Sequence, residues 1–329
     1  MIPAEAEEPV FPEDEGGPAR RLDFYGLSIP PLVRELRRQL AAHFHTRGMA
    51  PAWYVPRQLN PAPYHHFRDA RHADELPGLI ADAGPRYFAR RDFLDRWRGT
   101  FAPLPPLPLR PEFGEAGLAD PEGLVHVHAC ACWLILADLE MLGTRPLPRH
   151  WSDLLHPRYE RDIVLNGDEH GPNPLILANL ARDCTPAALE ALGRNTVAIQ
   201  GGAEMARAAG SRSPRRAALY VLPRFWAENN IHRDTTRIVW PEEGAYATPL
   251  LLLGKRDAGP SAAAVFDFLH GPQWNGQLEN IHCIPADGRR ATRPVPGRLR
   301  WLGWQAARDP ALDDTIRAAS AHFHRGYSR

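Results

Sequence analysis

The side chains best suited to chemistry lie on one predicted strand, Val125 to Trp133. Strand residues alternate between two faces, so the pattern predicts four metal-binding side chains on one face: His126, His128, Cys130 and Cys132. Imidazole nitrogen and thiolate sulfur suit Zn, Cu, Ni and Fe, and residues two apart can reach one ion. His126 and His128 are therefore candidate metal and ligand contacts. Packing in a core or hinge explains the same pattern, because cysteine is often buried.

Polar residues after two other predicted strands are candidate ligand contacts. Tyr64, His65 and His66 lie on the loop after the strand AWYVP, where they can orient a ligand or serve a metal. An exposed polar loop is the alternative explanation for these three residues. Gly84 ends the strand LPGLIADAG, and we expect its backbone to contribute to a ligand site.

The segment GDEHGPNP predicts the start of a helix, with Asn173 as N-cap and Pro174 as the first helical residue. Free N–H groups at such an end attract a carboxylate or phosphate. Asp168 and His170 lie beside this end and are candidate contacts. A capped loop without a ligand is the alternative.

Tyr220, on the predicted strand AALYVLP, is followed by Arg224 and Trp226 on the next loop. An aromatic face beside a guanidinium suits a planar or anionic organic ligand. Tyr220 fits equally well in a hydrophobic core. Trp226 is the second aromatic candidate.

The segment Arg237 to Lys255 reads as a strand, a tight acidic turn at Gly244 and a second, buried strand, which is the pattern of a crossing between two lobes. Glu242, Glu243 and Tyr246 lie at this turn. A carboxylate there can bind a cation or an amine, and one of the glutamates can instead hold the turn.

Familiar catalytic motifs are missing from the sequence. It contains no GxSxG, no phosphate-binding Gly-Lys-Ser/Thr loop, no GxGxxG and no HExxH, and no nucleophile and base can be paired. We therefore expect no catalytic residues, and the missing motifs argue against a hydrolase, a nucleotide triphosphatase and a dehydrogenase. An enzyme is a minor alternative. No cofactor is certain, and a transition-metal ion is the one candidate.

Composition narrows the class of protein. The 39 basic residues equal the 39 acidic ones, which gives no reason to expect nucleic acid as a partner. No apolar run approaches the roughly 18 residues of a membrane-spanning helix, so we expect no membrane insertion. Residues 1–21 predict a disordered acidic tail without the features of a secretory signal. We therefore expect a cytoplasmic protein, or a periplasmic one if the true N-terminus is longer or export is atypical.

With 329 residues the chain is long enough for two lobes. Predicted strands alternate with helices of 10 to 15 residues, which predicts α/β lobes that bind ligands at the carboxyl ends of their strands.

Several motifs together make the sequence resemble ABC-transporter substrate-binding proteins of the type II periplasmic-binding-protein class, the group that includes iron(III), thiamine and polyamine binders. The resemblance covers roughly residues 22–310. The motifs are Arg149 to Tyr159 before the strand Asp162 to Leu165, Gly202 to Ala206, Ala218 to Pro223, Trp240 to Ala245 with Thr248 to Leu250, Ala264 to Leu269, and Arg300 to Trp304.

The resemblance implies a two-lobed α/β fold, each lobe a mixed sheet flanked by helices, with two hinge crossings. Lobe I is expected at 22–125 and 250–329, lobe II at 135–237, and the crossings at 126–134 and 238–249. The implied function is capture of a small molecule or metal species, iron among them, by hinge closure. We expect a monomer, with an ABC permease as a possible partner. An intracellular ligand sensor or carrier on this fold is the alternative.

Overall fold

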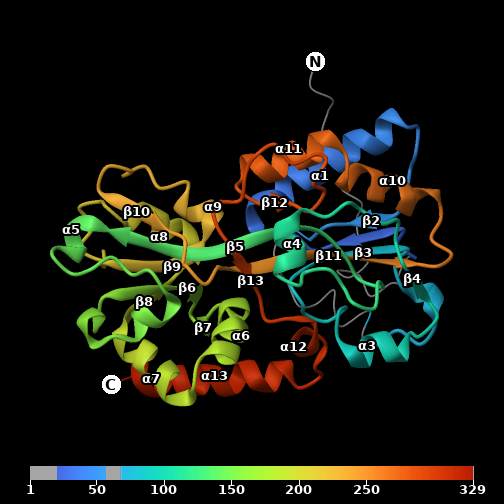
Figure 1. Ribbon diagram of the computed structural model, residues 1–329. Helices are drawn as coiled ribbons and strands as arrows, with labels where there is room; N and C mark the ends of the chain where they lie inside the picture. The colour runs from blue at the N-terminus through green and yellow to red at the C-terminus, as the bar shows by residue number, and fades with distance from the viewer. Residues whose placement is uncertain (1–20, 57–66, 68, 329) are drawn as a thin grey trace.

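The computed structural model describes residues 21–56, 67 and 69–328, which form two α/β halves side by side (Figure 1). Almost all of the predicted acidic tail, and the candidates Tyr64, His65 and His66, lie outside the described residues. Thirteen strands of the described chain form one sheet, whose main path runs β2-β1-β3-β11-β5-β9-β6-β7.

The first half holds the amino-terminal β-α-β unit predicted from the sequence. Here β1 pairs in parallel with β2 and β3. Its strands are β1 (Phe24–Gly26), β2 (Trp53–Tyr54), β3 (Leu79–Ala83), β4 (Phe101–Ala102) and β12 (Ile284–Pro285). Its helices are α1 (Pro30–Thr46), α3 (Arg91–Arg96), α4 (Pro111–Glu115), α10 (Pro260–Leu269), α11 (Pro272–Asn280) and α12 (Trp304–Arg308).

The second half is built around β6, which pairs in parallel with both β8 and β9. Its strands are β6 (Ile163–Asp168), β7 (Gly171–Pro172), β8 (Thr196–Gln200), β9 (Leu219–Pro223) and β10 (Thr236–Val239). Its helices are α5 (Leu139–Leu142), α6 (Pro174–Asp183), α7 (Pro186–Asn195), α8 (Gly202–Ala208) and α9 (Arg224–Ala227). Proline at the first turn of α6 and α7 starts both helices where the sequence predicts them.

Two long strands pass from one half to the other, β5 (His126–Asp138) and β11 (Ala245–Lys255). They pair antiparallel with each other from Tyr246 opposite Trp133 to Leu252 opposite His126. At their other edges β11 pairs with β3 in the first half and β5 with β9 in the second. The short strand β13 (Leu299–Arg300) pairs with the start of β11.

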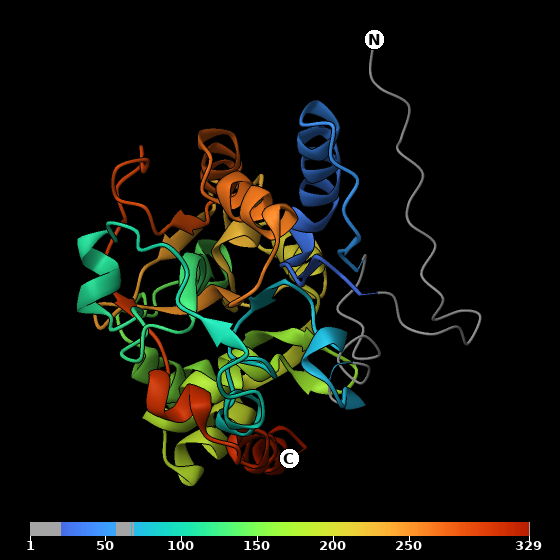
Figure 2. The same cartoon turned by 90° about the vertical axis from the view of Figure 1, so that its right-hand side faces the viewer.

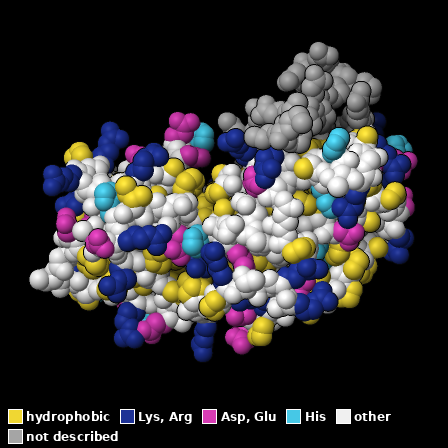
Figure 3. Space-filling view, turned by 90° about the horizontal axis from the view of Figure 1, so that it is seen from above, with side chains coloured by type: hydrophobic (Ala, Val, Ile, Leu, Met, Phe, Trp, Pro, Cys, Tyr) yellow, Lys and Arg dark blue, Asp and Glu magenta, His cyan; other side chains and the backbone are white. Residues whose placement is uncertain are grey.

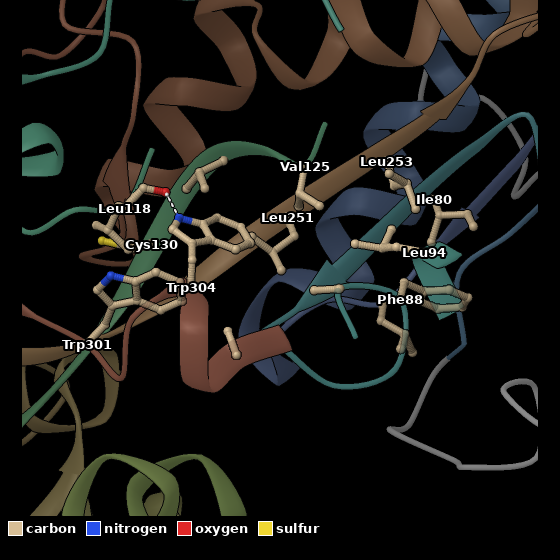
Figure 4. Close-up of a cluster of buried hydrophobic side chains, with 14 of the residues drawn as sticks. Ile80, Phe88, Leu94, Leu118, Val125, Cys130, Leu251, Leu253, Trp301 and Trp304 are labelled. Carbon is tan, nitrogen blue, oxygen red and sulfur yellow. Dashed lines mark hydrogen bonds between the residues drawn. The ribbon is translucent and has the colours of Figure 1, made fainter. Parts of the chain in front are cut away.

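Helices cover both faces of the sheet in each half. Figure 2 shows α1, α10 and α11, drawn in blue and orange, on one side of the strands and α12 and α13, in red, on the other. Beneath α10 lies an apolar cluster that includes Ala129 and Leu252, and beneath α12 lies another that includes Cys130 and Cys132. Figure 4 shows Cys130 beside Trp301 and Trp304. The indole N–H of Trp304 donates to the carbonyl of Leu118 at 3.1 Å.

The prediction that the histidines and cysteines of β5 share one face is wrong, because β5 contains a bulge. Leu250 lies opposite Ala129 whereas Leu251 lies opposite Val127, so His128 is an extra residue in the strand. A bulge of this kind reverses the alternation on one side of it. His126 and His128 consequently face α10, whereas Cys130 and Cys132 face α12.

The carboxyl-terminal helix α13 (Leu312–Tyr327) differs from the predicted division into lobes, which assigns 250–329 to the first lobe. Leu312 packs in the cluster beneath α12, but Phe323 packs in the core of the second half with α6 and α7. The helix therefore lies across both halves. It approaches α7 closely at two glycines, Gly193 of α7 and Gly326 of α13. A Cβ added to Gly193 would lie 2.1 Å from the carbonyl oxygen of Phe323, and one added to Gly326 would lie 1.9 Å from the carbonyl oxygen of Glu190.

We predict that Gly326→Ala destabilises the protein, because the new methyl group would overlap backbone that cannot move aside. The expected loss in free energy of unfolding is about 1–3 kcal/mol, as for other overpacked contacts. Gly276→Ala is the matched control, since Gly276 lies within α11 and has open space around it, so alanine there should be neutral or stabilising. Urea unfolding of both variants tests this, and equal stability would show that α13 does not dock on α7.

Candidate functional site

The two halves meet where the carboxyl end of β3 faces the start of α6. Gly84 follows β3 with φ of +90°, and a Cβ placed on it would lie 2.7 Å from the Leu175 side chain and 3.5 Å from that of Thr248. Thr248 belongs to the crossing strand β11, and its hydroxyl accepts a hydrogen bond from the Trp133 indole at 3.0 Å. Backbone from the first half, a helix start from the second half and a crossing strand therefore converge here.

Amide side chains line the second half of this meeting point. Asn166, near the carboxyl end of β6, donates from its side chain to the backbone carbonyl of Gln200, at the end of β8 (3.2 Å). The backbone carbonyl of Asn166 accepts from the N–H of Asn173 (2.9 Å), which caps α6 through a side-chain bond to the N–H of Leu175. These contacts fix the carboxyl ends of two parallel strands, the location at which open α/β sheets bind ligands.

Trp226 is an aromatic side chain at the boundary between the two halves. Its indole lies against Gly202, where a Cβ would be 2.1 Å from the ring. The ring is half-buried and packs against the apolar cluster beneath α10 in the first half and against the α8 cluster in the second. Seen from above, the surface is indented between the two halves (Figure 3). The interlobe site is defined here as Gly84, Asn166, Asn173, Leu175, Gln200, Trp226 and Thr248.

The predicted contacts Gly84 and Trp226 belong to this interlobe site, but His126 and His128 lie away from it, under α10. The Nε2 atoms of His126 and His270 are 3.1 Å apart, and Nδ1 of His270 donates to the Phe266 carbonyl (2.7 Å). Burial, followed by the neighbouring His270, lowers the pKa of His126 to about 3, and burial also lowers the pKa values of His128 and His270. All three rings are consequently neutral at physiological pH.

The predicted metal ligands do not form a complete set in the structure. Within the described ranges, no group of three or more His, Cys, Asp or Glu side chains is arranged to hold a metal ion. The bulge is the physical reason, since it turns Cys130 and Cys132 away from the histidines. A cavity of about 510 Å³ opens next to His270 between α1, α10 and α11, but its lining comes from the first half alone, so closure of the two halves would not enclose it.

Tyr220 lies in the core of the second half rather than at the interlobe site. Its side chain is fully buried among residues of β5, β6 and α8, and its hydroxyl accepts from the N–H of Ala217 (2.9 Å). Burial raises the pKa of Tyr220 to about 12. The core interpretation of this residue is therefore the one that the structure supports.

The acidic turn before β11 is held by its own side chains. Glu243 accepts from the Trp151 N–H (2.7 Å) and contacts the His150 ring (2.9 Å), while Glu242 forms an ion pair with Arg149. Both carboxylates therefore have partners within the protein. They fasten the crossing to the segment that leads into β6.

Tyr246 also contributes to the crossing rather than to an open site. Its ring stacks on Trp151 with centroids 4.5 Å apart, and its hydroxyl donates to Asp183 at 2.6 Å. Burial alone would raise the pKa of Asp183, but hydrogen bonds from Arg300, Arg182 and Tyr246 outweigh it and lower the pKa. This carboxylate therefore links the end of α6 to the crossing strand β11 and to the short strand β13.

Asp168 and His170 lie on the exposed β6–β7 hairpin, beyond the amide side chains. The Asp168 carboxylate accepts from the backbone N–H of His170 at 2.9 Å, and the His170 side chain is 85% exposed. Sequence reasoning found neither Gln200 nor Asn166, although Gln200 ends its strand and Asn166 lies near the carboxyl end of its strand. That position was the available signal, and neutral amides carry no motif that would add to it.

The fold and the interlobe site define a two-lobed binding protein of the type II periplasmic class. A family profile described as "bacterial extracellular solute-binding protein" matches residues 74–310, more than half of the chain. The chain belongs to this family. No curated protein matches its sequence.

Solved structures with the same fold share little sequence with this chain. The Bordetella ferric binding protein has a TM-score of 0.63 at 12% identity, covering 92% of this chain and 99% of that one. An ABC transporter protein from Clostridium perfringens gives 0.65 at 12%, covering 91% and 99%. A Trichodesmium protein solved with iron and citrate gives 0.62 at 12%, covering 92% and 98%. At this identity the likeness establishes the fold alone.

The expectation of a cytoplasmic protein is wrong, because the family consists of bacterial extracellular solute-binding proteins. That expectation depended only on the composition of the first residues, which carry no information about the ligand-binding lobes. No helix in the described part of the chain is long and apolar enough to cross a membrane.

We predict that the stability of the protein falls as the pH is lowered from about 6.5 towards 3. His126 is neutral in the fold but takes up a proton near pH 6.5 once unfolded, so the unfolded state binds more protons in this range. One such group changes the free energy of unfolding by up to about 1.4 kcal/mol per pH unit. His126→Gln should make the slope shallower, whereas the exposed His170→Gln should not. Urea unfolding between pH 7 and 4 measures both, and identical slopes for His126→Gln and wild type would contradict the assignment.

Proposed function

We propose that the protein captures a small solute between its two halves, at the interlobe site, and delivers it to the permease of an ABC importer. The observation that carries the proposal is the convergence of Gly84, Thr248 and Leu175, which brings the end of β3 in the first half and the start of α6 in the second half to the crossing strand β11. Membership of a solute-binding family supports the binding function. The permease as partner and the monomeric state are inferences from the fold.

The proposed lobes follow from the way the chain crosses between the halves. We assign residues 22–125 and 250–311 to lobe I and residues 135–237 to lobe II, with hinge crossings at 126–134 and 238–249. Helix α13 is assigned to lobe II at its carboxyl-terminal end, because Phe323 packs there. Closure then consists of a rotation about β5 and β11 that buries the solute against Trp226.

A metal-containing solute is a second candidate for the ligand. The reason is that two similar structures are described as a ferric binding protein and as a complex with iron and citrate. The described residues of the interlobe site supply amides, a hydroxyl and an indole rather than an anionic ligand set. A chelated metal therefore fits this site better than a bare ion.

Native mass spectrometry and elemental analysis of the purified protein, followed by a thermal-shift screen, test the proposal. A bound solute at a hundredfold excess over its Kd stabilises the fold by about 2.7 kcal/mol, which raises Tm measurably. Ferric citrate and organic solutes are screened in parallel, and ATPase stimulation of a permease encoded beside the protein tests delivery. Absence of any co-purifying solute together with no shift by any compound would contradict the binding function.

We predict that Gly84→Ala impairs closure of the two halves. The added methyl group would overlap Leu175, and alanine at φ of +90° is strained as well. Gly99→Ala is the matched control for strain, because Gly99 has φ of +85° and open space around it. Small-angle scattering should show a more open shape for Gly84→Ala alone, and Leu175→Ala in the same chain should restore the wild-type profile. A wild-type profile for the single variant would show that these residues do not meet.

A further inference from the structure

An unpaired amide lies at the interlobe site. Gln200 ends β8 and is only 8% exposed, yet its side-chain oxygen Oε1 has no hydrogen-bond partner. Its backbone carbonyl is already used by Asn166, so the strand end is fixed while the side chain is left unsatisfied. A buried acceptor without a donor is unfavourable, and binding of a ligand that supplies the donor removes this cost.

Gln200 and Trp226 share one face of the sheet. Along β8, Ile199 packs in the cluster beneath α6 and α7, whereas Ala198 packs with Trp226 in the cluster of α8. Side chains alternate along a strand, which places Gln200 on the same face as Ala198. Gly202 follows two residues later and lies directly against the Trp226 ring. The amide and the indole therefore border the same part of the interlobe site.

The chemistry of this pair restricts the ligand. The amide of glutamine offers an acceptor and a donor side by side in one plane, which complements a ligand edge with an adjacent N–H and acceptor. The indole offers a flat apolar face on which a planar ring can stack. Carboxylates, phenolates and imidazoles, which bind ferric or other transition-metal ions, are not part of this pair.

We propose that the interlobe site selects a planar nitrogen-containing solute, an aminoheterocycle or aromatic carboxamide, whose edge hydrogen-bonds to Gln200 and whose ring stacks on Trp226. This inference rests on the proposed solute-binding function and specifies its ligand class. The two side chains have separate roles. Gln200 selects ligands whose edge has a matching hydrogen-bond donor and acceptor, while Trp226 selects ligands with a planar ring.

Gln200→Leu provides the decisive variant, because it exchanges an unsatisfied amide for an apolar side chain of similar size. The unliganded protein should keep its Tm or melt higher, whereas binding of planar probes should weaken about ten- to a hundredfold. A merely structural glutamine would give the opposite result for Tm. Gln273→Leu, at an exposed position of α11, is the matched control and should change neither quantity.

Adenine, cytosine and nicotinamide serve as planar probes and ferric citrate as the comparison, with Kd measured by calorimetry on the full chain. Binding of at least one planar probe that Gln200→Leu weakens and Gln273→Leu does not would support the inference. It is overturned if no planar probe binds wild type, if Gln200→Leu binds the probes equally well, or if that variant melts lower. Binding of ferric citrate alone, unaffected by Gln200→Leu, would overturn the ligand class while leaving the solute-binding function intact.

Discussion

The antiparallel pairing of β5 with β11 is the constraint on which the rest of the molecule depends. These strands lie in the middle of the main path of the sheet, where β11 pairs with β3 of the first half and β5 pairs with β9 of the second. Their residues are almost all buried, so neither half has a complete core without them. Both crossings are hydrogen-bonded to each other, and the proposed closure is a rotation about this pair.

The bulge at His128 shows how a small local irregularity changes the chemistry available to the protein. With regular alternation, two imidazoles and two thiols would face one helix layer. One extra residue sends the histidines beneath α10 and the cysteines beneath α12 instead. Pro249, which cannot donate a ladder hydrogen bond, lies opposite Cys130 next to this irregularity. His128, Cys130 and Cys132 are buried beneath these helices. Burial raises the pKa of the Cys130 thiol and lowers the pKa of the His128 ring.

Much of the fold could be predicted from the sequence because short local patterns of residues indicate where its helices, strands and turns begin and end. Prolines at helix starts, the β-α-β opening and the strand-turn-strand segment around Gly244 all reappear as elements. The site was harder, since its members are recognisable only by where their strands end. Tyr220 illustrates the failure: a strand pattern gives its face but cannot say whether that face meets a cleft or a helix. Gln200 illustrates the opposite case, a residue that the sequence did not single out. It stands out only because its buried side-chain oxygen has no hydrogen-bond partner, and no sequence motif indicates that.

Helix α13 sets a further condition on any closing motion. Its close glycine contacts with α7 fix its carboxyl-terminal end to the second half, while Leu312 at its start packs in the first half. Near that start Arg90 binds the Asp309 carbonyl (3.0 Å) and the Asp313 carboxylate (2.6 Å), and Arg90 belongs to the loop that follows Gly84. The same loop therefore touches α6 at one end and α13 at the other. In the proposed closure, we infer that rotation of the halves is taken up in the short segment between α12 and α13. Asp313, in the first turn of α13, is exposed, whereas its partner Arg90 is buried in the first half.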